Sequence, residues 1–159
     1  MNVLLLEDRG SASFLLEEWL HQHRHSVLPA FNPADAQTVW GRRAIVPVDC
    51  ILLDLFVPMD GLGPEEQEKA EGGFLSGWVW LEGSVLATEP GMRDRVIVYS
   101  EYIAILTAHV PAERYRGIPL VSKRRRSGSS AEIVTHFERI AGLPRLQGAG
   151  PEHKLGGTQ

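Results

Sequence analysis

The residues best suited to chemistry in this chain lie where short apolar runs end. Asp54 follows the apolar run at 50–53. The other candidates, each at the end of such a run, are Glu7 and Asp8, Ser100, and Lys123. Clustered carboxylates could hold a hard divalent cation such as Mg²⁺, which prefers oxygen ligands. A shielded Asp54 could then attack phosphorus as a nucleophile, with a hydroxyl and an ammonium to hold the phosphoryl group.

The elements that must position these residues alternate along the chain. Apolar runs predict strands at 3–6, 26–31, 50–53, 96–99 and 118–121. Helical spacing of apolar residues predicts helices at 11–23, 33–40, 74–87, 101–109 and 130–141, and Ser11 is expected to cap the first of them. Strands alternating with helices predict an α/β fold with a parallel sheet covered on both faces.

Two prolines indicate the order of the strands. Pro29 and Pro119 fall in the second and fifth predicted strands, and proline within a sheet is confined to its edges. The resulting order is 2-1-3-4-5, the flavodoxin-like, doubly wound (βα)5 arrangement. Its ligand site lies at the carboxyl ends of the first and third strands, where Glu7, Asp8 and Asp54 are found.

Length and composition predict a soluble, cytoplasmic protein. The chain has 159 residues, of which 43% are hydrophobic and 23% charged, as expected for a globular domain with a full core. Its net charge of -4 argues against nucleic acid as the main partner. The single cysteine, Cys50, is interpreted as a buried strand residue and cannot form an internal disulfide. We expect no signal peptide and no membrane span.

Two stretches depart from the alternating pattern. Residues 58–73 are acidic and rich in glycine and proline, and they predict a long loop beside the site, either functional or mobile. Residues 143–159 lack periodicity and predict a disordered tail. The folded domain is therefore expected to span residues 1–142.

Four short motifs occur in order along the chain, each at a predicted strand end. They are Leu-Leu-Glu-Asp at 5–8, Leu-Leu-Asp-Leu-Phe-Val-Pro-Met-Asp-Gly at 52–61, Val-Ile-Val-Tyr-Ser at 96–100 and Val-Ser-Lys at 121–123. Together they resemble the receiver domain of two-component response regulators, over roughly residues 1–142.

The resemblance implies a stand-alone phosphorelay protein rather than an enzyme, with at most autocatalytic phosphotransfer and autodephosphorylation. Asp54 would accept a phosphoryl group from a phosphohistidine on a histidine kinase or phosphotransfer protein. The implied ligands of Mg²⁺ are Glu7, Asp8, Asp54 and the backbone carbonyl of Phe56. The residues implied to bind the phosphoryl group and to act as a switch are Ser100 and Lys123. The signal would leave through contacts with a downstream protein, and a homodimer through the fourth and fifth strands is one expected arrangement.

The chain departs from the family's pattern at several positions. The step from Asp54 to Ser100 is 46 residues, longer than usual because of the acidic loop. Glu101 stands where the family has a small residue, and Leu120 where it often has a rotating aromatic. Arg124 replaces a common proline after the lysine. Glu101 and Leu120 are therefore expected to modulate the site, and they leave open a receiver-like interaction module that works without phosphorylation.

Other readings of individual residues carry less weight. A metal-dependent phosphatase would need an acid/base near Asp54, where Phe56 is the nearest same-face residue and Asp60 a loop candidate. Histidines 21, 23 and 25 are interpreted as solvated groups at a helix end rather than as metal ligands. The basic run at 123–126 is interpreted as a solvated loop. Trp78 and Trp80 cannot share one helix face, so one of them is expected on a partner surface.

Overall fold

A parallel sheet forms the centre of the protein, whose computed structural model describes residues 1–8, 10–124, 129–144 and 146. In the described residues the sheet has five strands in the order β2-β1-β3-β4-β5. The strands are β1 (Asn2–Leu6), β2 (Ser26–Ala30), β3 (Cys50–Leu53), β4 (Val96–Ser100) and β5 (Leu120–Ser122). The predicted fold class and strand order are confirmed. Pro29 lies in edge strand β2, and Pro119 directly precedes the other edge strand, β5.

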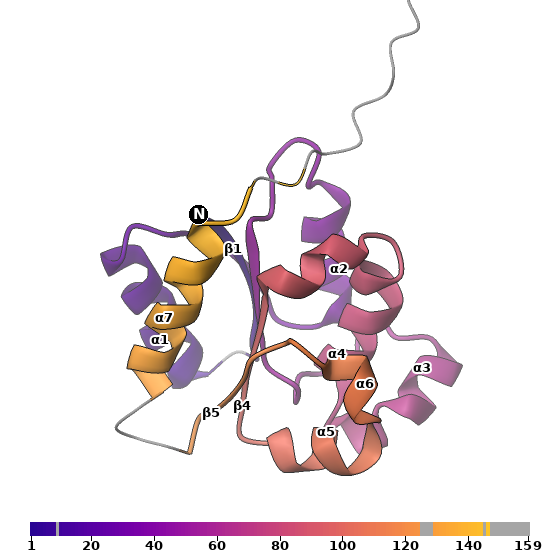
Figure 1. Cartoon of the computed structure of the whole chain (residues 1–159). Coiled ribbons are helices and arrows are strands. Elements are labelled where there is room, and N and C mark those ends of the chain that lie inside the picture. Colours follow the sequence, from indigo (N-terminus) through magenta and orange to yellow (C-terminus); the bar gives the residue numbers. More distant parts are fainter. Residues whose placement is uncertain (9, 125–128, 145, 147–159) are drawn as a thin grey trace, which may run out of the picture.

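Helices cover both faces of this sheet (Figure 1). The α-helices are α1 (Ser11–Gln22), α2 (Pro33–Gly41), α3 (Pro64–Lys69), α4 (Ser76–Trp80), α5 (Ile103–His109), α6 (Ala112–Tyr115) and α7 (Ser129–Ala141). They are joined by the 3₁₀-helices η1 (Glu71–Gly73) and η3 (Pro90–Arg95) and by the π-helix η2 (Leu81–Leu86). Helices α1 and α7 cover one face, and α2, α4 and α5 the other. Within the described residues, no helix combines the length and the apolarity needed to cross a bilayer.

The core consists of two apolar clusters, one on each face of the sheet. Successive strand residues point to opposite faces, so Leu4 and Leu6 belong to the cluster beneath α2 and α4, and Val3 and Leu5 to the cluster beneath α1 and α7. All four side chains are buried. Burial on both sides explains why the central strands are continuous apolar runs instead of alternating ones.

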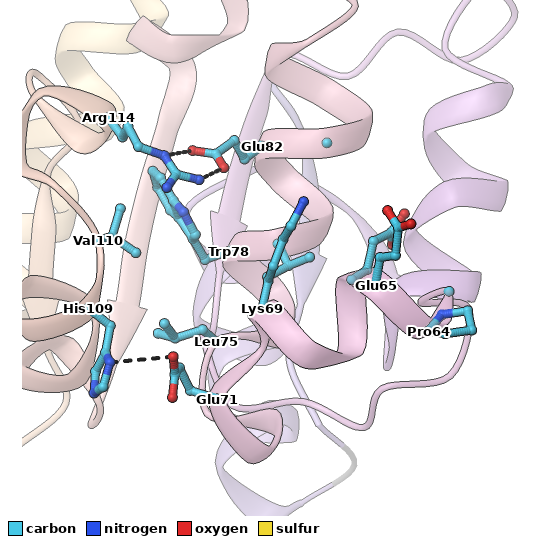
Figure 2. A pocket seen from close by; sticks show the side chains of 14 residues that line it. Pro64, Glu65, Lys69, Glu71, Leu75, Trp78, Glu82, His109, Val110 and Arg114 are labelled. Carbon is cyan, nitrogen blue, oxygen red and sulfur yellow. Dashed lines mark hydrogen bonds and ion pairs between the residues drawn. The ribbon is translucent and has the colours of Figure 1, made fainter.

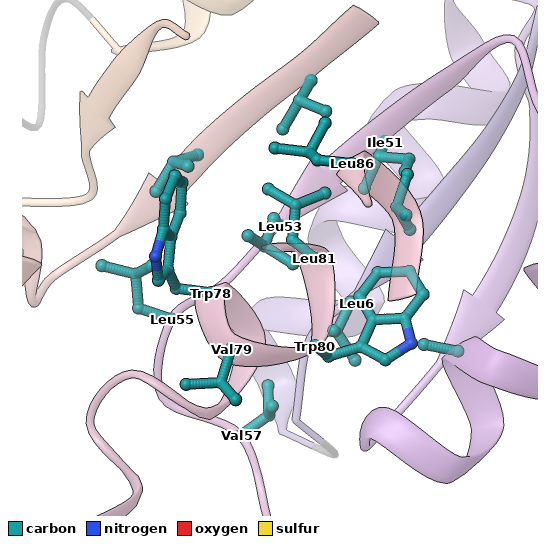
Figure 3. Packing of buried hydrophobic residues seen from close by; sticks show 14 of the residues in the cluster. Leu6, Ile51, Leu53, Leu55, Val57, Trp78, Val79, Trp80, Leu81 and Leu86 are labelled. Atoms are coloured by element: carbon teal, nitrogen blue, oxygen red, sulfur yellow. The ribbon is translucent and has the colours of Figure 1, made fainter. Parts of the chain in front are cut away.

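Helix α4 is buried on all sides, which contradicts the prediction that Trp78 or Trp80 is exposed. Trp78 is 1% exposed and Trp80 2%. Figure 3 shows the two indoles on opposite sides of the helix, with Leu53 and Leu81 between them. Trp80 Nε1 donates a hydrogen bond to Gln37 Oε1 on α2 at 3.2 Å. The prediction assumed one solvent-facing side, but α4 packs against both α2 and α3 as well as the sheet.

The stretch at 58–73, predicted as a loop, contains helix α3 and the 3₁₀-helix η1. Signals for α3 were present in the sequence: Pro64 in the first turn, with Glu65 and Glu66, and Lys69 in the last turn. None of the α3 residues is buried, so there was no apolar periodicity to find. Helix α1 also differs in detail, because Gly10 is its N-cap residue and Ser11 its first helical residue. Most of the predicted tail, 143–159, and Arg125 and Arg126 lie outside the described residues.

Hydrogen bonds and a close backbone approach hold helix α4 against the segment that follows β3. Gly77 N–H donates to Leu55 O at 3.0 Å, and Ser76 Oγ lies 2.5 Å from Val57 O and 2.8 Å from Gly73 O. A Cβ atom at Gly77 would lie 2.0 Å from Asp54 O. Only glycine permits this approach, so residue 77 sets the distance between the helix and the segment that carries Asp54.

Gly77→Ala is expected to destabilise the protein by about 1–3 kcal/mol, because backbone must move to relieve the overlap with Asp54 O. The measurement is the free energy of unfolding in urea. Gly83→Ala is the matched control on the following helical turn, since a Cβ there would have no atom within 4 Å. Alanine at 83 should be neutral or stabilise by up to about 1 kcal/mol. Equal effects of the two substitutions would contradict the close-approach argument.

Candidate functional site

The five residues that the sequence singled out come from four neighbouring strand ends. The backbone ladder continues one residue past the strands: Asp54 N–H donates to Leu6 O at 2.8 Å, and Lys123 N–H donates to Ser100 O at 3.2 Å. These bonds align Asp54 with Glu7 on β1 and Lys123 with Ser100 on β4. The carboxyl edge of the sheet is therefore the candidate site, as the strand order predicts.

Asp54 is the centre of the side-chain contacts at this edge. Ser100 Oγ donates to Asp54 Oδ1 at 2.6 Å. Lys123 Nζ donates to Asp54 Oδ2 at 2.6 Å and to Glu7 Oε2 and Oε1 at 2.6 and 2.8 Å. Glu7, Asp54 and Ser100 are buried, with exposed fractions of 4%, 7% and 0%. The geometry thus brings a carboxylate, a hydroxyl and an ammonium into direct contact, through residues far apart in the sequence.

Burial and mutual repulsion change the acid–base properties of this group. Burial raises the pKa of Glu7 to about 8, the charge of Asp54 adds to the rise, and Lys123 opposes it. Burial alone would lower the pKa of Lys123, but the adjacent Asp54 and Glu7 carboxylates raise it. Lys123 also lies 5.4 Å from the centre of the Tyr99 ring. The site therefore favours a cation close to Asp54. When Lys123 is the only cation there, Glu7 holds a proton.

The carboxylates could also hold a divalent metal ion. One oxygen from each of Glu7, Asp8 and Asp54 lies within 4.8 Å of the others. Among the described residues, these three form the one group of side chains that could together hold a metal ion. Asp8 is exposed, which leaves room for the water ligands that Mg²⁺ retains. A hard cation fits this oxygen donor set. The Phe56 N–H lies 3.4 Å from Asp54 Oδ1; a role for the Phe56 carbonyl stays a prediction.

An aromatic cluster beside the site was not foreseen from the sequence. Phe56, Phe74 and Tyr102 form a triangle with ring centres 5.1–5.2 Å apart. The N–H of Tyr102 donates to Ser100 Oγ at 3.2 Å. Phe56 and Tyr102 each follow a site residue by two positions, a spacing that could have indicated their place. Nothing local marks Phe74, which reaches the cluster from the end of the 58–73 stretch.

The two predicted modulators are not in contact with Asp54 through any described hydrogen bond or ion pair. Glu101 is exposed. Leu120 is half-buried and packs against the core cluster beneath α2 and α4. Leu120 therefore serves as a core residue on β5, whereas Tyr102 is an aromatic residue whose backbone N–H bonds to Ser100 Oγ. Modulation by Glu101 or Leu120 stays a prediction.

The remaining candidates lie away from this edge or are structural. His23 Nδ1 is 2.8 Å from Trp19 O at the end of α1, which agrees with a helix-end role. His25 packs on Phe137, and burial lowers its pKa. Burial raises the pKa of the Cys50 thiol, as expected for an inert core residue. Asp60 is exposed, and its carbonyl accepts a hydrogen bond from Ala34 on α2.

Solved structures similar to this chain include receiver domains. The HemR receiver domain of Leptospira biflexa, in its non-phosphorylated form, superposes with a TM-score of 0.63 at 20% identity, covering 92% of this chain and 98% of that one. The receiver domain of the sensor histidine kinase PA1611 of Pseudomonas aeruginosa, with a magnesium ion coordinated in its active-site cleft, gives 0.59 at 18% identity, with 89% and 98% covered.

A third similar structure is that of a response regulator protein. TrrA of Thermotoga maritima, in complex with Mg²⁺ and BeF, gives a TM-score of 0.59 at 16% identity and covers 87% of this chain and 97% of that one. No protein-family model and no curated protein sequence matches the chain. The chain therefore has the receiver-domain fold, and the fold implied by the resemblance is confirmed by structure where sequence matching finds nothing.

Glu7 in the metal-free protein is expected to titrate near pH 8, because burial and the Asp54 charge oppose its ionisation. The folded chain then holds this proton more tightly than the unfolded chain, whose glutamate has a pKa of 4.5. The contribution of Glu7 to the free energy of unfolding is full below that value and is lost as the pH rises through about 8. Carbon-13 NMR of the glutamate carboxyls measures the titration. Glu7→Gln should remove both the resonance and this part of the pH dependence, whereas a midpoint near 4.5 would be contrary to expectation.

Lys123→Met is expected to lower the free energy of unfolding by about 3 kcal/mol at neutral pH without Mg²⁺, because the buried Asp54 carboxylate loses its cation and Glu7 loses its hydrogen-bond donor. Urea unfolding measures the change. Lys69→Met is the control, since Lys69 is exposed on α3 and has no ion pair among the described residues. A loss no larger than that of the control would show that the Lys123 contacts contribute little.

Proposed function

We propose that this protein is a response-regulator receiver that accepts a phosphoryl group on Asp54 and relays the event through protein contacts. The observation that carries the proposal is the contact of one buried carboxylate with Ser100 at 2.6 Å and Lys123 at 2.6 Å, beside Glu7. A hydroxyl and an ammonium from two other strands converge on this one carboxylate, and the same two donors could bind the oxygens of a phosphoryl group attached to it.

The proposed reaction is an exchange of one phosphorus bond for another. An Asp54 carboxylate oxygen attacks the phosphorus of a phosphohistidine, an O–P bond forms, and the N–P bond breaks. The electron pair of the broken bond stays on the imidazole nitrogen of the donor. Hydrolysis of the resulting acyl phosphate returns Asp54 and inorganic phosphate, so the chain acts as a phospho-acceptor and not as an enzyme acting on an external substrate.

Ser100 and Lys123 would change partners in this reaction. Both donate to Asp54 before transfer, and the new phosphoryl oxygens would take over these hydrogen bonds. Mg²⁺, held by Glu7, Asp8 and Asp54 with the Phe56 carbonyl, would neutralise the charge that accumulates on the transferred group. The three carboxyl oxygens within 4.8 Å of one another support this assignment.

The expected partners follow from the proposed role. The phosphoryl donor would be a phosphohistidine on a histidine kinase or a phosphotransfer protein, and the receiver of the signal a further protein. A homodimer and a cytoplasmic location belong to the same proposal. The receiver domains of HemR, PA1611 and TrrA support the fold on which it rests.

A second candidate is an interaction module with this fold that works without phosphorylation. It is favoured by Leu120, which packs into the core where the resemblance implies a rotating aromatic. Without that aromatic, the usual way of conveying a change at Ser100 is absent. A phosphatase has less support, because Asp60 is exposed, its carbonyl is bonded to α2, and its carboxylate is not part of the acidic cluster.

Incubation with acetyl phosphate and Mg²⁺ should add one phosphoryl group to the protein, measured by intact mass. Asp54→Asn should abolish the addition, because an amide oxygen is a poor nucleophile. Asp60→Asn is the matched control, since Asp60 is an exposed carboxylate six positions away and should leave the addition unchanged. Omission of Mg²⁺ should slow it at least tenfold. Addition that survives Asp54→Asn, or no addition at all, would sink the proposal in favour of the interaction module.

A further inference from the structure

The turn that joins α2 to β3 exposes a run of apolar side chains. Residues 44–47 of this turn are Ala-Ile-Val-Pro, and all four are exposed. Ile45, at 83%, is the most exposed large apolar side chain among the described residues, and Val46 is 42% exposed. Single exposed apolar residues are ordinary on protein surfaces, but a consecutive run of them marks a surface that contacts something else. We call residues 42–47 the α2–β3 turn.

The α2–β3 turn belongs to the edge of the sheet at which the strands begin, which we call the amino edge. In Figure 1 the turn is the purple loop at the top of the view, away from the carboxyl edge that carries the candidate site. Hydrogen bonds fix both of its ends. The N–H groups of Ile45 and Val46 donate to Arg42 O at 2.9 and 3.0 Å, and Asn2 Nδ2 donates to Pro47 O at 2.8 Å. The apolar tip is therefore preorganised, and a contact made there costs little ordering of the backbone.

A third exposed apolar side chain, that of Leu146, lies at the same edge. Arg43 Nε donates to Glu89 Oε2 at 3.1 Å, which joins the α2–β3 turn to the segment that leads into η3. Two residues further on, a Cβ atom at Gly91 would lie 3.3 Å from Leu146 Cδ2, and Leu146 is 38% exposed. Of the six large apolar side chains that are exposed in the described residues, three are thus at the amino edge.

The amino edge is also rich in arginine. Arg24 precedes β2, Arg42 precedes β3 and Arg116 precedes β5, and all three side chains are exposed. None of them has a hydrogen bond or ion pair with the described residues. The turns that precede β2 to β5 together contain six arginines and three carboxylates. These turns are residues 23–25, 42–49, 88–95 and 116–119. Because the chain as a whole has a net charge of -4, positive charge is concentrated at this edge.

Two of the three carboxylates in these turns already have partners. Asp49 Oδ2 accepts a hydrogen bond from the N–H of Asn2 at 2.8 Å, and Glu89 is paired with Arg43. Asp94 is exposed. Within the described part of these turns, one carboxylate without a partner therefore stands against three arginines without one.

The cations around α4 are in a different setting. Figure 2 shows Arg114 of α6 joined to Glu82 of η2, with Nε donating to Oε2 at 2.7 Å, and His109 Nδ1 beside Glu71 Oε1 at 3.4 Å. Lys69 lies on α3, which also carries three glutamates. The excess of arginine at the amino edge is therefore not repeated around α4.

The unpaired arginines are spread along the whole amino edge. Arg24 at β2 and Arg116 at β5 are separated by four strand intervals, roughly 19 Å at the usual spacing of strands in a sheet. The α2–β3 turn protrudes from the central strand between them. A short peptide would reach only part of this row, and a nucleic acid would leave the apolar tip without a complement. A bilayer that contains anionic lipids presents negative charge over the whole row and an apolar layer beneath it.

We propose that the amino edge is a binding surface for bilayers that contain anionic lipids. Ile45 and Val46 would enter the boundary between the head groups and the acyl chains, and the three unpaired arginines would pair with lipid phosphates. Contact of this kind needs no spanning helix. It leaves the carboxyl edge of the sheet facing the solvent, and it does not depend on phosphorylation.

Binding is tested by sedimenting the full chain with sucrose-loaded vesicles. Vesicles of equal parts phosphatidylglycerol and phosphatidylcholine are compared with vesicles of phosphatidylcholine alone. We expect the partition coefficient to be about tenfold larger for the anionic vesicles or more, and to fall as added salt screens the arginines. Inorganic phosphate at the same concentration as the lipid phosphate should not release the protein, because it offers no apolar layer.

The first pair of variants tests insertion of the apolar tip. Ile45→Ser combined with Val46→Ser should weaken binding about tenfold, because both side chains that would leave water are removed. Phe14→Ser combined with Leu15→Ser on α1 is the matched control, since these side chains are 67% and 64% exposed. The control should leave binding unchanged.

The second pair of variants tests the arginines. Arg24→Gln combined with Arg42→Gln should weaken binding to anionic vesicles about tenfold. Lys69→Gln combined with Arg124→Gln removes the same charge from exposed positions away from the amino edge, and should weaken it less than about twofold. All eight substituted residues are exposed, so unfolding in urea should verify that each variant is folded.

Every outcome either supports the lipid surface or overturns it. Equal binding to neutral and anionic vesicles, no binding to either, or equal losses in the controls would overturn it. A loss with the arginine pair but not with the Ile45–Val46 pair would show attraction without insertion, which also overturns it. A DNA duplex that displaces the vesicles, with the same dependence on Arg24 and Arg42, would assign the edge to nucleic acid instead.

Discussion

The sharing of one ammonium by two buried carboxylates is the constraint on which the rest of the site depends. Glu7 and Asp54 end neighbouring strands at the carboxyl edge of the sheet, where both are screened from water and repel each other. Lys123, from the far edge strand, relieves the repulsion by bonding to both. The strand order that brings β5 next to β4, and β1 next to β3, is what makes this three-way contact attainable.

Hydrogen bonds and one close backbone approach connect the same edge to the helical layer. Gly77 lets α4 approach the carbonyl of Asp54, and Ser76 ties the helix to the segment that follows. On the other side, Ser100 receives the N–H of Tyr102 at the entrance to α5. The Asp54 carboxylate and the helices α4 and α5 are consequently joined by one network of hydrogen bonds and close contacts.

Much of the fold and the centre of the site could be predicted from the sequence, because both follow from local signals. Continuous apolar runs marked the strands, Pro29 and Pro119 ordered them, and polar residues at the ends of the runs marked Glu7, Asp8, Asp54, Ser100 and Lys123. The misses needed tertiary information. Full burial of Trp78 and Trp80 depends on what covers α4. The packing of Phe74 against Phe56 and Tyr102 depends on the path that residues 58–73 take beside the site.

The complete burial of α4 has a consequence for how the molecule opens. Every residue of this helix is screened from solvent by the sheet and by α2 and α3. Its amide protons can exchange with water only when these neighbours separate, and that separation also loosens the segment around Asp54. The helix therefore cannot fray independently of Asp54, and the two belong to one cooperative unit of local unfolding.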